Sequence, residues 1–157
     1  MAGMRFVLRL DAWFRFALYG AFALLVVTGA VWLVADQLKD SPEGELWQRI
    51  SASMLMIHGG VAMLTLLMLG ALFPLHIRLG WRSRRNRITG PAMIAFNAVL
   101  IVTAFGLYYS GSDTVRPWAS DVHIGLGFAL PALFVVHILL GRRSRPDKNG
   151  AEGRLIS

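Results

Sequence analysis

Apolar residues gather in four long runs along this chain, and all charged residues lie outside these runs. Each run is free of Asp, Glu, Lys and Arg over about the 20 residues that a helix needs to cross the hydrocarbon core of a bilayer. The predicted spans are residues 16–35, 50–77, 91–109 and 122–141. The pattern therefore predicts an all-α fold, an integral membrane four-helix bundle.

The composition agrees with a lipid environment and excludes several kinds of chemistry. Apolar residues make up 55% of the 157-residue chain, and the mean hydropathy is +0.54, which leaves too little charge to cover a water-soluble surface. The absence of cysteine excludes disulfides, thiolate-bound iron–sulfur clusters and covalently attached c-type haem. The net charge of +7 does not indicate nucleic acid binding, because the basic residues stand in short clusters between the apolar runs.

The connecting segments differ in charge, and this difference predicts the orientation of the chain. Of the 16 basic residues, all but Lys39, Arg49 and Arg116 lie before the first run, between the second and third, or after the fourth. Because cytoplasmic loops carry an excess of Lys and Arg, we expect both termini and the segment 82–87 in the cytoplasm. The five tryptophans fall near the predicted ends of spans, where the indole ring is favoured.

The predicted organisation is one transmembrane domain, residues 1–141, followed by a flexible cytoplasmic tail, residues 142–157. The first run makes a poor secretory signal, because it is too long and Asp11 interrupts the basic segment before it. We therefore expect this run to be retained. Residues 4–14 mix arginine with large apolar side chains, which fits either a helix on the inner membrane surface or an extension of the first span.

Short similarities between the spans hint at an internal duplication. Residues 23–28 (ALLVVT) resemble residues 98–103 (AVLIVT), and His58 and His123 each begin an H-x-G sequence. Two such helix pairs would be parallel repeats related by an axis along the membrane normal.

All four histidines lie within predicted spans, His58 and His76 in the second, His123 and His137 in the fourth. Ionisable residues inside a membrane are costly and mark functional sites. Eighteen residues separate the first pair, which is five helical turns, and fourteen separate the second, which is about four, so each pair lies on one helix face. Because both spans run inward, His58 and His123 are expected near the outer side and the other two near the inner side.

This arrangement predicts two b-type haems, one above the other. Imidazole is a common axial ligand of haem iron, and helix bundles build such sites between facing helices. We expect one non-covalent haem b between His58 and His123, and a second between His76 and His137. A single haem, a proton or metal-ion path, and a structural subunit without a cofactor are the alternative interpretations.

The two histidine spacings are unequal. At 1.5 Å per residue, the histidines are about 27 Å apart along the second span and about 21 Å apart along the fourth. The two helices therefore cannot both be straight and parallel. Pro74 and Pro131 are candidate sources of bends, since each removes a helical hydrogen bond. Gly70 and Gly127, four residues before the prolines, would let a flat macrocycle or a neighbouring helix approach closely.

Basic side chains at the ends of the spans are candidates to neutralise the haem propionates. Arg78 and Arg142 lie at the expected inner end, and Arg116 lies with Tyr108 and Tyr109 at the expected outer end. The same arginines also fit the role of orientation signals and interface anchors.

With this histidine pattern the chain resembles the small bacterial four-helix di-haem cytochromes b, which include the membrane-anchor cytochromes of formate dehydrogenases and NiFe hydrogenases. The likeness extends from His58 to His137 and includes residues 87–90 (RITG), 105–109 (FGLYY) and 123–127 (HIGLG). Those anchors typically also use a histidine of the first span, which this chain lacks. Its use of two helices is more similar to the cytochrome b of quinol:cytochrome c reductase.

The resemblance implies electron transfer across a bacterial inner membrane, between a quinone pool or an inner-side donor and a periplasmic redox partner. No nucleophile–base pair, carboxylate dyad or phosphate-binding loop occurs in the sequence, and no span contains a carboxylate. We therefore expect an electron-transfer subunit of a membrane oxidoreductase complex rather than an enzyme by itself. The outer connections between the predicted spans are short, so a separate periplasmic protein or a larger membrane complex is the expected partner, besides the lipid bilayer.

Overall fold

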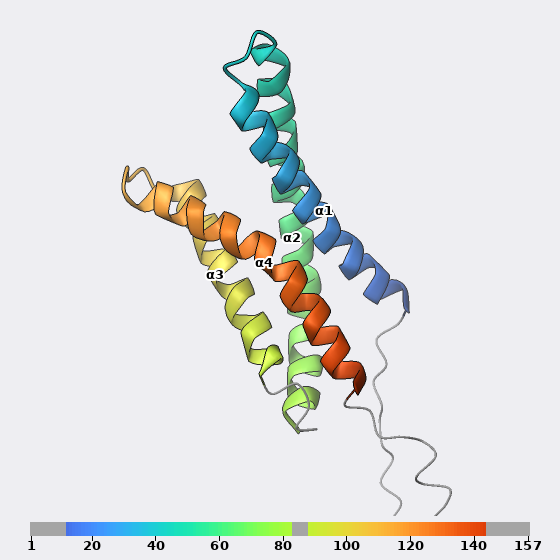
Figure 1. Ribbon diagram of the computed structural model, residues 1–157. Coiled ribbons are helices and arrows are strands. Elements are labelled where there is room, and N and C mark those ends of the chain that lie inside the picture. Colours follow the sequence, from blue (N-terminus) through green and yellow to red (C-terminus); the bar gives the residue numbers. More distant parts are fainter. Residues whose placement is uncertain (1–11, 83–87, 144–157) are drawn as a thin grey trace, which may run out of the picture. The chain divides into compact units, whose positions relative to one another are not determined.

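The computed structural model describes residues 12–82 and 88–143, with the side chains of residues 74–82 and 143 left out of the description. The described residues form helices and no strand (Figure 1). The helices are α1 Ala12–Leu38, α2 Gly44–Arg82, α3 Thr89–Tyr109 and α4 Val115–Arg143. Each predicted span lies inside one of these helices, so the prediction of an all-α fold with four apolar helices is confirmed.

All four helices are long and apolar enough to cross a membrane. Large apolar side chains are exposed along them, for example Met56 and Leu67, each 74% exposed, and Val102, 68% exposed. Exposed apolar surface on this scale is favoured when lipid is the solvent, and helices are suited to lipid because they satisfy their own backbone hydrogen bonds.

The helices extend beyond the apolar runs, which corrects the predicted length of the outer connections. Only residues 39–43 connect α1 to α2, and only residues 110–114 connect α3 to α4, so both are five-residue turns. The first turn of α2 is stabilised by an ion pair from Arg49 to Glu45, 2.6 Å long, at helical i,i+4 spacing. Charged residues outside the apolar run therefore continue the helix instead of forming a loop.

Two predictions at the ends of the chain are affected by these bounds. Trp13 and Phe14 belong to α1, as expected if the N-terminal stretch extends the first span, while residues 4–11 lie outside the described residues. α4 includes Arg142 and Arg143, so the tail predicted from residue 142 cannot begin before residue 144. The remainder of the tail also lies outside the description.

Neither proline within a span ends its helix. α2 continues through Pro74 to Arg82, and α4 continues through Pro131 to Arg143. Helices in membranes tolerate such prolines because neighbouring groups take up the freed carbonyl. A bend at either proline stays a prediction.

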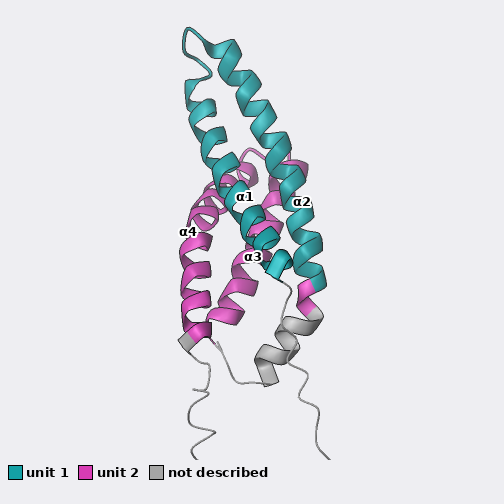
Figure 2. Ribbon diagram, turned by 90° about the vertical axis from the view of Figure 1, so that its right-hand side faces the viewer, with its two compact units in different colours: residues 1–71 teal, residues 72–157 magenta. Residues whose placement is uncertain are grey.

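The chain divides into two compact units, residues 1–71 and residues 72–157 (Figure 2). The first unit pairs α1 with most of α2, and the second pairs α3 with α4 and includes the end of α2. Small residues are buried in both, among them Ala21 and Ala35 in the first and Ala119 in the second. Small side chains let helices approach closely in lipid, where van der Waals packing rather than the hydrophobic effect holds them together.

Candidate functional site

The buried polar side chains of the described residues are all threonines: Thr28, Thr65, Thr89 and Thr103, between 2% and 7% exposed. A buried hydroxyl needs a hydrogen-bond partner, and a helical threonine can use the main-chain carbonyl one turn earlier in its own helix. Three of the four threonines also contact a histidine on the neighbouring helix. These three threonine–histidine pairs form the candidate site.

In the first unit, the side chain of Thr28 on α1 contacts the imidazole of His58 on α2. The Thr28 Oγ1 atom lies 3.0 Å from His58 Nδ1. The same hydroxyl donates to the carbonyl oxygen of Leu24 at 2.6 Å, with the carbonyl of Leu25 at 3.2 Å. The imidazole also packs against α1, because a Cβ added to Gly29 would lie 3.5 Å from His58 Cε1. The first helix thus fixes the ring that the second helix carries.

The second unit repeats this arrangement near its own turn. Thr103 Oγ1 of α3 lies 2.9 Å from Nδ1 of His123 on α4. The Thr103 hydroxyl donates to the Val99 carbonyl at 2.8 Å and lies 3.1 Å from the Leu100 carbonyl. In both units the threonine therefore comes from the first helix of the pair and the histidine from the second.

A third pair lies toward the other end of the second unit, where Thr89 Oγ1 is 3.1 Å from His137 Nδ1. Fourteen residues separate Thr89 from Thr103, and fourteen separate His123 from His137. Because α3 and α4 run antiparallel, equal spacings keep both contacts in one helix–helix register. The same register brings a Cβ placed on Gly106 within 3.4 Å of Ala119. The fourteen-residue spacing of the two histidines in α4 is therefore matched by the spacing of the two threonines in α3.

The contacts of the threonine hydroxyls favour one tautomer in two of these rings. A hydroxyl carries one proton, and the protons of Thr28 and Thr103 are donated to their own main-chain carbonyls. In this arrangement their oxygens can only accept from His58 and His123, which favours the tautomers with the proton on Nδ1. A neutral imidazole with its proton on Nδ1 carries its lone pair on Nε2, the nitrogen that a metal ion can use.

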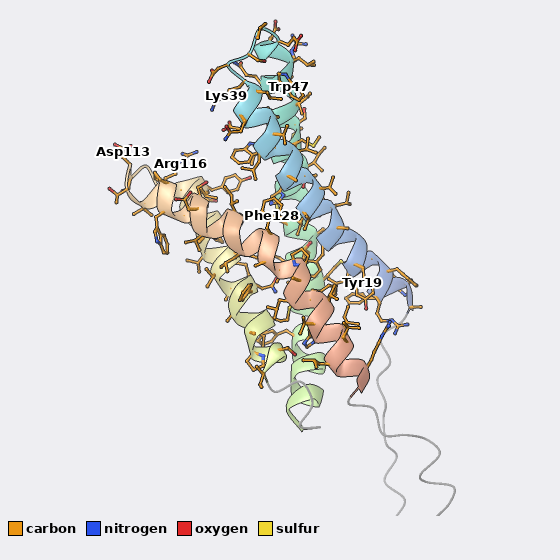
Figure 3. The ribbon with its side chains drawn as sticks, in the orientation of Figure 1. Tyr19, Lys39, Trp47, Asp113, Arg116 and Phe128 are labelled. Carbon is orange, nitrogen blue, oxygen red and sulfur yellow. The ribbon has the colours of Figure 1, made fainter. Side chains whose placement is uncertain are left out.

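The predicted arginine sites lie at the ends of the helices. Arg116 is exposed in the first turn of α4, beside the turn that contains Asp113, and Figure 3 shows both residues there. Arg142 is exposed in the last turn of the same helix. Tyr108 and Tyr109 are exposed at the end of α3, where the ring of Tyr109 stacks on Phe105 with centroids 5.6 Å apart. These positions match the predicted helix ends, and contacts to propionates stay predictions.

His76 and Arg78 lie within α2, and their side chains are outside the description. His58 belongs to the first unit, whereas His123 and His137 belong to the second. The structure joins each described histidine to a threonine of its own unit, and the pairing of histidines across the units stays a prediction. Among the described residues, no group of three or more His, Asp or Glu side chains could hold a metal ion.

The threonines are the residues of the candidate site that the sequence pattern did not identify. A signal for two of them was present, because both similar segments, residues 23–28 and 98–103, end in threonine. The residues around each threonine are apolar, so nothing in the local sequence separates it from a packing residue. Comparison of the chain with family models, with curated proteins and with solved structures finds no match. Function is therefore inferred from the geometry of the histidines.

Proposed function

We propose that this chain is a membrane electron-transfer subunit that carries two b-type haems. The supporting observation is the set of three histidines whose Nδ1 atoms each contact a buried threonine hydroxyl, at 2.9 to 3.1 Å. Histidines that bind metals usually donate their other ring N–H to a nearby acceptor, which fixes the tautomer and the orientation of the ring. Thr28 and Thr103 supply that acceptor to His58 and His123.

The residues around these histidines are compatible with a haem. A bis-histidine haem needs two neutral imidazoles with lone pairs on Nε2, which is the tautomer that the threonines favour. A Cβ added to Gly60, Gly125 or Gly127 would meet no atom within 4 Å, so the backbone near both histidines is accessible to a flat group. The absence of cysteine fits non-covalent binding. We assign one haem to His58 and His123 and the other to His76 and His137.

A bound haem b would supply one-electron chemistry at its iron. The protein would hold the imidazoles in place, exclude water through its apolar helices and balance the charge of the propionates. Arg116 at one end of α4 and Arg142 at the other are the proposed propionate partners, one for each haem. Stacked at two depths, the haems would connect the two sides of the membrane, with a quinone pool or an inner-side donor on one side.

The proposed location is the inner membrane of a bacterium, with both termini in the cytoplasm. The distribution of Lys and Arg supports this orientation. The turns 39–43 and 110–114 would then face the periplasm. Two five-residue turns offer little surface for a substrate site, so a periplasmic redox protein or a larger membrane complex is the proposed partner.

The deciding experiment is a reduced-minus-oxidised visible spectrum of the purified protein, together with a haem-to-protein ratio. The proposal expects the bands of low-spin haem b and a ratio near two. A colourless protein refutes it and favours a histidine-based proton path or a structural role. A ratio near one would refute the two-haem assignment while keeping the haem.

A further inference from the structure

The described part of the chain contains four buried threonines, of which three contact a histidine. Thr28 and Thr103 each donate to a main-chain carbonyl and contact a histidine Nδ1. Thr89 contacts His137 Nδ1 at 3.1 Å, and the residues one turn before Thr89 lie outside the described residues. Thr65 donates to the Val61 carbonyl at 2.8 Å and contacts no described histidine. This contrast separates the role of the hydroxyl towards histidine from its role in packing.

The carbonyl bond decides what the hydroxyl does to the ring. In Thr28 and Thr103 the only hydroxyl proton is committed to the carbonyl, so the oxygen presents lone pairs to the histidine. A ring proton on Nε2 would require the hydroxyl to turn its proton from the carbonyl to Nδ1, which would leave the hydroxyl and carbonyl oxygens 2.6 or 2.8 Å apart with no proton between them. In a buried site that arrangement is costly, because neither group can turn to water. The tautomer with the proton on Nδ1 is therefore favoured.

We infer that Thr28 and Thr103 are positioning residues that lock His58 and His123 in the tautomer able to ligate haem iron through Nε2. This inference rests on the proposed function for the identity of the metal group, although the tautomer lock itself does not. Thr89 Oγ1 lies 3.1 Å from His137 Nδ1 and orients that ring.

The lock has a consequence for the reduction potential of a bound haem. An Nδ1–H group that donates to an oxygen makes the imidazole a stronger electron donor, which favours ferric iron. Thr→Val is nearly isosteric and removes the acceptor, so it weakens this donation and also makes the site less polar. Both effects favour ferrous iron and raise the potential. Thr28→Val and Thr103→Val therefore each raise the potential of the haem bound by His58 and His123.

The test in the haem-loaded protein is a redox titration of the full chain with Thr28→Val, Thr103→Val, Thr89→Val and the control Thr65→Val. The first two raise the potential of one and the same haem, and the control leaves both potentials unchanged, although it removes an equally buried hydroxyl. Thr89→Val changes only the other haem. Thr28→Ser and Thr103→Ser keep the hydroxyl but lose the methyl group, and we expect them to keep the wild-type potential. A role in packing alone would make the serine variants differ from the wild type.

A second readout follows the histidines directly. In the reduced-minus-oxidised infrared spectrum, imidazole bands identified by ¹⁵N-histidine labelling report hydrogen bonding at Nδ1, and they shift in Thr28→Val but not in Thr65→Val. If Thr28→Val and Thr103→Val change neither the bands nor the potentials beyond the control, the inference is overturned while the haem proposal stands.

A colourless wild-type preparation separates the two failures in the other direction. Such a preparation refutes the proposed function, but ¹⁵N NMR of its histidines still reports their tautomers. Protons on Nδ1 of His58 and His123, moving towards Nε2 in the valine variants, support the lock without haem. Protons on Nε2 in the wild-type protein overturn it.

Discussion

A side chain at Gly29 would meet the imidazole ring of His58, which makes this glycine a sensitive position for the proposed site. A Cβ there would lie 3.5 Å from Cε1 and 3.7 Å from Nδ1 of His58, both ordinary van der Waals distances. Gly29→Ala is therefore expected to leave the ring in place. It should also stabilise α1 by about 0.5–1 kcal/mol, because alanine loses less conformational entropy in a helix interior than glycine.

Gly29→Val should have the opposite effect. Its γ-methyl groups extend about 1.5 Å beyond Cβ, and a β-branched side chain in a helix has one strongly preferred rotamer. A methyl aimed at the ring would approach well inside the contact distance, so the ring must move. The hydrogen bond to Thr28, 3.0 Å long, is lost after a displacement of only about 0.5 Å. Overpacking of this kind costs about 1–3 kcal/mol.

The assay is the haem-to-protein ratio of the purified variants and the temperature at which the Soret band is lost. Gly20→Val is the matched control, because Gly20 lies in the same helix and a Cβ there meets no atom within 4 Å. We expect Gly29→Val to lose much of one haem and the Gly20→Val and Gly29→Ala variants to keep both. Equal haem content and stability in Gly29→Val and Gly20→Val would refute the close contact between α1 and His58.

Three further predictions test the pairing, the orientation and the ion pair of the first α2 turn. His123→Ala and His137→Ala should each lose a different haem in the visible spectrum, and loss of the same haem from both would contradict the two-level pairing. Because the chain has no cysteine, Asp113→Cys and Arg85→Cys give clean sites for a membrane-impermeant thiol reagent. The first should react in intact spheroplasts and the second only after lysis, and the reverse pattern would invert the proposed topology. Glu45→Gln breaks an exposed ion pair, so the free energy of unfolding measured by thermal denaturation should fall by less than about 1 kcal/mol. A larger loss would contradict a weak contribution of this pair to the first turn of α2.

The candidate site was only partly predictable from the sequence. Histidine is rare and costly in an apolar run, so the four rings were visible as functional candidates. Threonine is common in membrane helices, and its hydroxyl can bond within its own helix, so a threonine with a functional partner looks like any other. Thr65 and Thr103 both lie in apolar runs, and along the chain Thr103 differs only in ending one of the two similar segments. The histidine contact itself becomes visible only with the neighbouring helix, where His123 Nδ1 lies 2.9 Å from the hydroxyl of Thr103.

The histidine spacings also could be interpreted only in part from the sequence. In the sequence, the fourteen residues between the histidines of the fourth span stand against the eighteen between those of the second. In the structure, the spacing of His123 and His137 instead matches that of Thr103 and Thr89 on α3. Helix register depends on which side chains face each other across an interface, and a one-dimensional pattern does not contain that information.

By itself, the sequence determined the four apolar helices. The length and the uninterrupted apolar character of a run are local properties, and they can be compared directly with the thickness of a bilayer. The sequence also located the histidines within those helices. The tertiary structure decided where the helices end and how short the turns between them are. It alone decided which hydroxyl faces which imidazole, because hydrogen-bond distances of about 3 Å arise only when two helices pack in one register.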